Sequence, residues 1–329
     1  MKLRRFSLVF VLLLILLCLT FGLSLFWGAV NIDFETIRRS LFQFDASDQQ
    51  QQILRNIRLP RLLTDLLIGG AFAVGGCLIQ GVTRNPLADS GLLGINGGAS
   101  LGLALSFVFL PQARPMQVAL CSFIGAFVAT LLIFCITQFS RTGRSEVGLV
   151  LAGVAISSFF QALSQGIGLF FNLQQDLAFW FIGGTANVTW GQLTAVAPIL
   201  LLTLLLCFGL TREVNVLLLG EETAVSLGRN PSLIRGIVLF LVMILVGASV
   251  SLVGPVGFVG LLVPHVMRHF VGTDQRLLLP LCFLGGAWLV LIADLAARMV
   301  NPPFETPFGI LLAVIGVPFL LYKVWQVAD

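Results

Sequence analysis

Long apolar segments, separated by turn residues and charges, dominate the hydrophobic pattern of the chain. Ten such segments can be marked, at residues 6–27, 61–82, 92–110, 116–139, 147–171, 191–210, 235–253, 256–271, 278–299 and 307–327. A helix needs roughly 20 apolar residues to cross the hydrocarbon core of a bilayer, and most of the segments reach about that length. The pattern therefore predicts an all-α polytopic membrane protein with about ten transmembrane helices.

The segment at 256–271 is shorter than a full span, and glycine and proline interrupt the sequence around it at Gly254, Pro255, Gly257 and Gly260. Irregular backbone at membrane depth is tolerated where other parts of the protein surround it. We therefore predict a half-span here, packed among the other helices. An even number of spans also places both termini on the same side of the membrane.

The charge content separates the chain from soluble proteins. Of the 329 residues, 57% are apolar and 10% are charged, whereas about 25% of the residues of an average soluble domain are charged. This composition excludes a cytosolic globular enzyme, a disordered chain and a nucleic-acid-binding protein. Ten spans use roughly 200 residues, so residues 1–329 are predicted to form a single transmembrane domain with short connections.

The distribution of basic residues predicts the orientation in the membrane. Lys2, Arg4 and Arg5 precede an apolar segment that is too long for a cleaved signal peptide, so we expect a cytoplasmic N-terminus. Counting spans from there places seven arginines on the outer side, namely Arg38, Arg39, Arg55, Arg58, Arg61, Arg114 and Arg298. The stretch from Arg38 to Arg61 breaks the positive-inside rule, which suggests a functional use for these arginines.

A polar segment at about residues 212–231 is predicted to lie on the cytoplasmic side. Within it, Glu221 and Glu222 begin a short helical pattern that Gly228 closes and Asn230-Pro231 terminates. A surface helix lying on lipid headgroups would favour basic residues over paired glutamates. We therefore interpret this amphipathic helix as a segment that fits a groove on a cytoplasmic partner.

This segment resembles the cytoplasmic coupling loop of ABC importer permeases, with its E-E-x-A-x-x-L-G core. Four other stretches resemble the permease family that imports ferric siderophores, haem and cobalamin (FecCD/BtuC-like). They are Leu59-Pro60-Arg61, Asn85-Pro-Leu-Ala followed by Gly91-Leu-Leu-Gly94, Gly257-Phe-Val-Gly-Leu-Leu-Val-Pro-His265, and Ala293-Asp-Leu-Ala-Ala-Arg298. The five motifs follow in family order and at family spacing over about residues 5 to 325.

The resemblance implies a function and a set of partners. The chain would be the permease subunit of an ATP-driven importer that moves an iron–siderophore complex from periplasm to cytoplasm, with cobalamin or haem as alternative cargo. Its partners would be a second permease chain, identical or paralogous, two cytoplasmic ATPase chains and a periplasmic substrate-binding protein. The implied location is the bacterial inner membrane, with both termini in the cytoplasm.

The resemblance also implies roles for particular residues. Docking of the binding protein would use Arg58, Arg61 and Arg298, because a guanidinium pairs carboxylates bidentately and stays charged; the alternative is that these arginines anchor span ends at lipid headgroups. Coupling to the ATPase would involve Leu219, Gly220, Glu221, Glu222, Ala224, Leu227 and Gly228. The gate of the pathway would include Asn85 and Leu87, with Ser145 and Glu146 as a second candidate, although an Asn-Pro turn without a gating role is an open alternative.

The chain itself carries no ATPase signature. Its only lysines are Lys2 and Lys323, and neither follows the G-x-x-x-x-G frame of a P-loop. We therefore predict that this subunit is not an enzyme and that a separate subunit hydrolyses ATP.

Two functions of other classes compete with the importer. In an ion-coupled secondary transporter, Asp65, Glu146 and Asp294 would be the coupling carboxylates, but Asp65 and Asp294 each have an arginine one helical turn away. In an intramembrane hydrolase, Gly98-Ala-Ser100-Leu-Gly102 would be a nucleophile elbow, which needs a strand, a histidine and an acid. A small-residue packing stripe of Gly94, Gly98 and Gly102 is the favoured interpretation.

The only two histidines, His265 and His269, could share one face of a helix. A metal site needs a third or fourth ligand, and only Asp274 is near in sequence. We predict a structural role for the histidines, with no metal and no cofactor.

Overall fold

The computed structural model describes residues 2–28, 30–86, 88–89, 94–139, 146–301 and 306–328, whose regular structure is entirely helical. Ten helices correspond to the ten predicted apolar segments: α1 (Lys2–Phe26), α4 (Leu59–Thr83), α5 (Ile95–Phe109), α6 (Pro115–Phe139), α7 (Glu146–Phe170), α9 (Trp190–Gly209), α12 (Pro231–Val253), α13 (Val259–Val271), α14 (Gln275–Val300) and α15 (Phe308–Ala328). In this part of the chain seven helices are long and apolar enough to cross a membrane. The shorter apolar helices are Ile95–Phe109, Val259–Val271 and Phe308–Tyr322. The predicted all-helical membrane fold is confirmed.

The predicted half-span is helix α13, which has 13 residues. At a rise of 1.5 Å per residue it covers about 20 Å, less than the thickness of the hydrocarbon core. The backbone turns sharply before it, with φ of 76° at Gly254 and 69° at Phe258. The glycine and proline residues that marked this region in the sequence therefore produce the break between α12 and α13.

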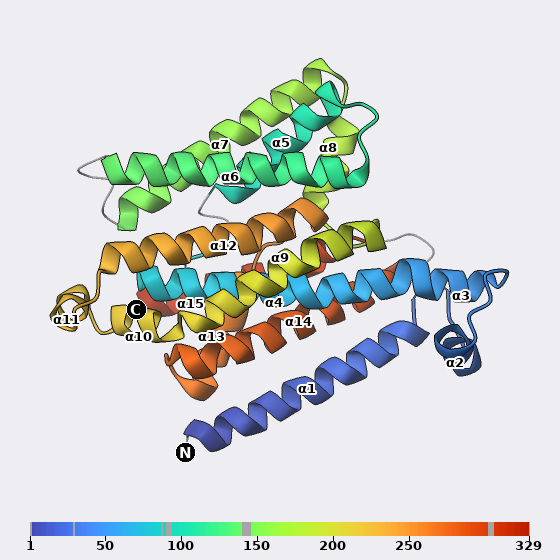
Figure 1. Cartoon of the computed structure of the whole chain (residues 1–329), viewed down its shortest axis with the longest axis horizontal. Coiled ribbons are helices and arrows are strands. Elements are labelled where there is room, and N and C mark those ends of the chain that lie inside the picture. The colour runs from blue at the N-terminus through green and yellow to red at the C-terminus, as the bar shows by residue number, and fades with distance from the viewer. Residues whose placement is uncertain are drawn as a thin grey trace.

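Five short elements connect or cap the long helices: α2 (Phe34–Phe42), α3 (Gln49–Ile53), α8 (Gln174–Ile182), α10 (Thr211–Leu218) and α11 (Glu221–Ser226). Of these, only α11 is predicted by the sequence pattern. Helices α2 and α3 lie at one end of the bundle, whereas α10, α11 and both chain termini lie at the other (Figure 1). The termini therefore share one end, as an even number of spans requires.

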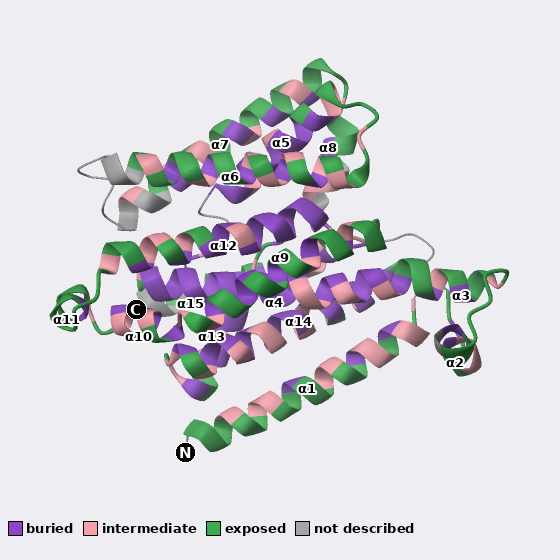
Figure 2. Ribbon diagram, viewed as in Figure 1, coloured by how far each residue is buried: buried purple, intermediate pink, exposed green. Residues whose placement is uncertain are grey.

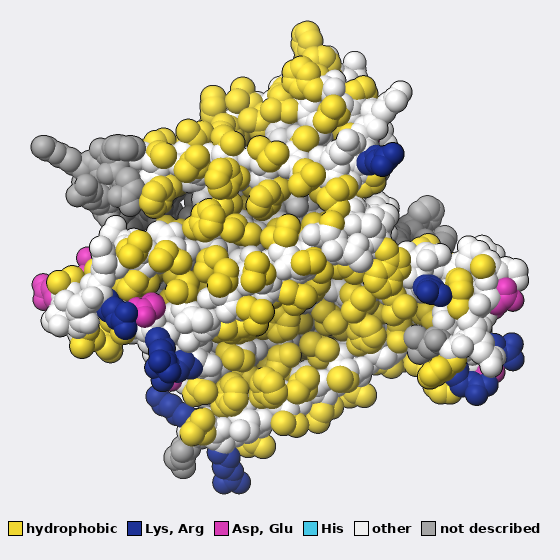
Figure 3. Space-filling model, viewed as in Figure 1, with side chains coloured by type: hydrophobic (Ala, Val, Ile, Leu, Met, Phe, Trp, Pro, Cys, Tyr) yellow, Lys and Arg dark blue, Asp and Glu magenta, His cyan; other side chains and the backbone are white. Residues whose placement is uncertain are grey.

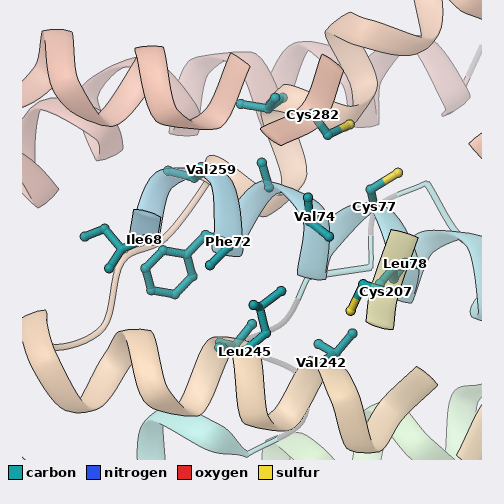
Figure 4. Packing of buried hydrophobic residues seen from close by; sticks show 14 of the residues in the cluster. Ile68, Phe72, Val74, Cys77, Leu78, Cys207, Val242, Leu245, Val259 and Cys282 are labelled. Atoms are coloured by element: carbon teal, nitrogen blue, oxygen red, sulfur yellow. The ribbon is translucent and has the colours of Figure 1, made fainter. Parts of the chain in front are cut away.

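Helix α4 is the centre of the bundle and packs against α9, α12, α13 and α14. It is mostly buried, whereas α1 is largely exposed along its length (Figure 2). Figure 4 shows Ile68 and Phe72 on α4 and Leu245 on α12 as members of one continuous buried cluster. An exposed apolar surface on α1 is expected of a helix that faces lipid.

The glycines of α5 allow close helix packing. A β carbon at Gly98 would lie 2.3 Å from the carbonyl oxygen of Gly125 on α6, and one at Gly102 would lie 2.2 Å from that of Cys121. Between them, the Ser100 hydroxyl donates to the Ser164 hydroxyl of α7 at 2.7 Å. Ser100 thus lies on a buried helix and not on a strand-to-helix turn, which confirms the packing stripe and removes the nucleophile elbow.

Helices α3 and α4 are joined by a π-helical turn at Leu54–Arg58, so that residues Gln49–Thr83 form one helical segment. Pro60, in the first turn of α4, has no N–H to donate and would clash with the carbonyl four residues earlier in a regular α-helix. A wide turn relieves this conflict. It also sets the direction of Arg58, the last residue of the turn.

Candidate functional site: the two ends of the bundle

A buried cluster of charges lies at the end of the bundle near α2 and α3. Arg61 on α4 donates from Nε and Nη2 to Oδ1 of Asp294 on α14, at 2.9 and 2.7 Å. Arg298, one turn further along α14, places Nε 3.1 Å from Oδ2 of the same carboxylate. Asp294 is completely buried, and Arg61 and Arg298 are each 4% exposed. One buried carboxylate therefore forms ion pairs with two buried arginines.

Arg58 belongs to the same cluster but has neutral partners. Its guanidinium donates to the carbonyl oxygen of Leu25, at 2.5 Å, and to that of Val30. The side chain is 5% exposed. A β carbon at Gly28 would lie 3.2 Å from Arg58 Nη2 and 3.4 Å from Arg298 Nη1, so the chain leaving α1 passes directly over both arginines.

The carboxylate of Asp65 is also completely buried at this end of α4. Its Oδ1 accepts a hydrogen bond of 2.8 Å from Thr185, and its Oδ2 has no hydrogen-bond partner among the described residues.

The four-residue spacing in the sequence suggested that Arg61 pairs with Asp65 and that Arg298 pairs with Asp294, each within one helix. The pair of Asp294 with Arg298 is confirmed. The ion pair described for Arg61 crosses to another helix, which spacing within α4 does not reveal.

Exposed basic side chains also occur on α2 and in the π-helical turn before α4. Arg38 and Arg39 on α2 both pair with Glu35, at 2.8 and 3.0 Å. The hydrogen bonds from Arg38 and Arg39 lower the pKa of Glu35, so its carboxylate stays ionised at lower pH than an ordinary glutamate does. The Arg55 guanidinium lies 4.5 Å from the centroid of the Phe44 ring. Figure 3 shows Lys and Arg side chains near α2 and α3 at one end of the molecule and others at the opposite end, with an apolar surface between them.

Helices α10 and α11 form the candidate coupling site at the opposite end. The short helix predicted from Glu221 is confirmed as α11, and Gly228, with φ of 72°, lies in the turn that follows it. The N–H of Arg229 reaches back to the carbonyl of Ala224 at 2.9 Å, which closes the end of the helix. Ala224 is completely buried and fixes α11 against the bundle.

Large apolar side chains project from this coupling site. Leu219, Val225 and Leu227 are 67%, 61% and 57% exposed. They lie in the polar connection between α9 and α12, beside the exposed carboxylates of Glu221 and Glu222. Contiguous apolar side chains rimmed by charge are typical of a protein-binding surface.

The predicted gate is only partly described. Asn85 lies just after α4, where its carbonyl accepts from the N–H of Ala88 at 3.1 Å. Leu87 and Ser145 lie outside the described residues, as does the side chain of Glu146, which begins α7. The structure therefore does not bring the four predicted gate residues into one described site.

Both histidines lie on α13, His265 in the middle of the helix and His269 in its last turn. The His265 ring contacts Phe319 of α15, with centroids 5.4 Å apart, and His269 contacts Phe270. Among the described residues, no three potential metal-ligating side chains come together. The metal-free state stays a prediction.

Helix α10 and its contacts were not predicted from the sequence. Its buried residues, Thr211, Val214 and Leu217, recur every three positions, which is a signal for a short amphipathic helix. Asn215 on the same helix hydrogen-bonds to Asp274 at the start of α14, and no pattern in the sequence pairs these two residues.

Comparison with known proteins gives consistent matches over nearly the whole chain. The sequence profile of the FecCD transport family matches residues 13–326. The iron(3+)-hydroxamate import system permease protein FhuB of Bacillus subtilis (strain 168) is 40% identical over 97% of this chain and 84% of its own length. The hemin transport system permease protein HmuU of Yersinia pestis is 39% identical over 95% of this chain and 93% of its own.

A solved structure, an inward-facing conformation of a putative metal-chelate type ABC transporter, has the same fold. It superposes with a TM-score of 0.85 at 30% identity and covers 97% of this chain and 99% of its own. The similarity therefore includes both ends of the bundle.

Proposed function

Because the chain belongs to the FecCD transport family of ABC transporter permeases, we propose that it moves an iron–siderophore complex from the periplasm to the cytoplasm. As a permease of this family it is a non-catalytic subunit that works within an ABC transporter. Because the chain belongs to this family, an ABC importer is favoured over the secondary-transporter and hydrolase alternatives. The name of FhuB supports a hydroxamate-type iron chelate as cargo, and the name of HmuU keeps haem as the second candidate.

The observation that carries the proposal is the exposed apolar surface of the coupling site. Leu219, Val225 and Leu227 project from a short helix and its flanking turns at one end of a membrane protein, where no lipid chain covers them in the proposed orientation. An ATPase groove that receives α11 would bury these side chains. Since the chain has no P-loop, the energy for import would come from ATP hydrolysed by two separate ATPase subunits, each with a groove of this kind.

The proposed assembly also includes a second permease chain. Two permease proteins of the Escherichia coli Fe(3+) dicitrate transport system, FecC and FecD, both resemble this chain. A pair of permeases with a pathway between them suits a bulky chelate. We propose a location in the bacterial inner membrane, with both termini and the coupling site in the cytoplasm.

A periplasmic binding protein would deliver the chelate at the end that carries the arginine cluster. Arg58, Arg61 and Arg298 remain the proposed docking residues, and their contacts suggest different roles. Arg61 and Arg298 already share the carboxylate of Asp294. The described hydrogen bonds of Arg58 go to carbonyl oxygens, so this residue is best placed to exchange them for an incoming carboxylate.

Reconstituted transport tests the proposal. The permease is placed in proteoliposomes with its ATPase and binding protein, and the uptake of a ferric hydroxamate chelate, haem and cobalamin is compared. We expect uptake of the ferric chelate that vanadate abolishes and a protonophore does not. Preferential uptake of haem or cobalamin would overturn the assigned cargo, and protonophore-sensitive uptake without ATP would overturn the mechanism.

A further inference from the structure

The side chain of Asn215 joins the coupling site to the first turn of α14. Its Nδ2 donates to Oδ1 of Asp274 at 2.7 Å, and its Oδ1 accepts from the N–H of Gln275 at 2.9 Å. Asp274 is the N-cap of α14 and accepts from the N–H of Arg276 at 3.1 Å. A helix start leaves four N–H groups without a partner in the helix. Here the cap itself and a side chain from α10 satisfy two of them.

The surroundings of this contact are closely packed. Val214, Leu217 and Gln275 are almost completely buried. A β carbon at Gly81 of α4 would lie 2.8 Å from Val214 and 3.4 Å from the amide of Gln275. Helices α4, α10 and α14 therefore meet without free space between them. Closely packed elements of this kind move together and transmit a displacement.

Polar contacts also fix α4 to the same junction. Arg84, which ends α4, donates from Nε to the carbonyl oxygen of Leu217 at 3.1 Å. The Cys77 thiol donates to the Gln275 side chain at 3.3 Å. The first contact reaches the end of α10 and the second reaches the start of α14, so α4 is held to each of these helices separately.

The ion pairs described around α11 lie at the surface. Glu221 of α11 pairs with Arg235 of α12, and Glu213 of α10 pairs at 3.3 Å with Arg229 in the turn after α11. All four side chains are partly or largely exposed. Exposed ion pairs contribute little stability. These ion pairs therefore offer little resistance to a partner that binds α11, whereas α10 is held to α4 and α14 by the partly buried contacts described above.

Helix α14 leads from this junction to the arginine cluster. Its 26 residues span about 39 Å. Asp274 and Gln275 lie at its start, and Asp294 and Arg298 lie near its other end. We propose that Asn215 and Asp274 are positioning residues that transmit movement of the coupling site into α14 and so couple ATP hydrolysis to transport. This inference rests on the proposed importer function.

A charge-neutral exchange tests the contact. Asn215→Leu removes both hydrogen bonds and keeps the number of side-chain heavy atoms, and Asn215→Asp places a second carboxylate against Asp274. Combining Asn215→Asp with Asp274→Asn exchanges the two side chains. The amide at position 274 can then donate to the carboxylate at position 215, which can still accept from the Gln275 N–H. Thr189→Val is the matched control, because Thr189 caps the start of α9 at the other end of the bundle.

The measurement is the amount of ferric hydroxamate chelate imported per ATP hydrolysed by the complete transporter in proteoliposomes. We expect both single Asn215 variants to bind the ATPase and hydrolyse ATP but to lower this ratio at least about fivefold, the lower range of coupling between linked sites. The double variant should recover most of the ratio, and Thr189→Val should keep it. If Asn215→Leu fails to assemble, the comparison of Asn215→Asp with the double variant decides the question.

Two results would overturn the inference: a normal ratio in an assembled Asn215 variant, or a double variant as impaired as Asn215→Asp alone. Failure of the proposed function is distinguishable, because wild-type transporter would then show no vanadate-sensitive uptake. A wild type that imports the chelate, together with Asn215 variants that import it equally well per ATP, would remove only the positioning role.

Discussion

Arg61 and Asp294 are 233 residues apart in the sequence and form a buried ion pair, with Arg61 Nη2 2.7 Å from Asp294 Oδ1. The pair joins α4 to α14, and Asp294 also forms an ion pair with Arg298. Removal of one partner of a buried pair leaves an uncompensated charge, which is more costly than the loss of the attraction itself. Asp294 is therefore the residue on which the arginine cluster depends.

Replacement of that carboxylate should destabilise the protein. Asp294→Asn removes the carboxylate that pairs with both Arg61 and Arg298, and we expect a loss of roughly 3–5 kcal/mol in the free energy of unfolding. The melting temperature of the purified protein in detergent measures this effect. Glu35→Gln, which breaks the exposed pairs with Arg38 and Arg39, is the control and should hardly change the melting temperature. Equal melting temperatures for both variants would contradict the assignment.

Docking of the binding protein should depend on Arg58. Arg58→Ala is expected to weaken docking by roughly tenfold or more, the effect of losing a charge pair at an interface, and Arg58→Glu should weaken it further. Titration of the binding protein onto the permease in nanodiscs gives the dissociation constants. Arg114 lies in the connection before α6 and in no family motif, so Arg114→Ala should leave the affinity unchanged.

Arg298→Ala is expected to weaken docking as well, but with a lower melting temperature, because the change also disturbs Asp294. Wild-type affinity in both Arg58→Glu and Arg298→Glu would show that these arginines serve only the fold.

The coupling site should tolerate no charge on its apolar surface. Leu227→Asp combined with Gly228→Asp places two carboxylates on the surface proposed to enter the ATPase groove, and Gly228 in addition needs its positive φ. We expect the variant to insert into the membrane but to lose uptake. Membrane fractionation, co-purification of the ATPase and chelate uptake are measured together. Normal uptake would rule out α11 as the docking helix.

The close approach of α5 and α6 should be sensitive to volume. Gly98→Leu places a side chain where even a β carbon lies 2.3 Å from the carbonyl of Gly125, so the helices must separate, at a cost of about 1–3 kcal/mol or more. A β carbon at Gly22 on α1 would have nothing within 4 Å, and Gly22→Leu is the matched control. Thermal unfolding of both variants provides the comparison; a stable Gly98→Leu variant would be inconsistent with the packing stripe.

The histidines should be dispensable for transport. His265→Gln together with His269→Gln keeps the polar character of both positions, and we expect uptake within a few-fold of wild type. Elemental analysis of the purified protein accompanies the uptake assay. A stoichiometric metal that disappears in the double variant would contradict the predicted metal-free state.

Much of this architecture follows from the sequence alone, because the thickness of the bilayer fixes the length of an apolar helix whatever its neighbours are. The ten apolar segments therefore correspond to ten helices, and the glycine and proline residues around residues 254–260 locate the half-span. Short helices such as α2, α3, α8 and α10 escaped prediction because a few residues of amphipathic pattern carry too little signal to stand out between spans.

Only the tertiary structure decided which polar residues meet. Helical periodicity reveals that Arg298 and Asp294 share a face, but not that Arg61 joins them from another helix, or that Asn215 reaches Asp274 across 59 residues. It also decided that the arginines proposed to dock the binding protein are buried, with Arg58 directed inward from a π turn next to Pro60. The physical reason is that apolar spacing along a helix specifies which face is buried, whereas the partner of each buried polar group depends on how the helices pack in three dimensions.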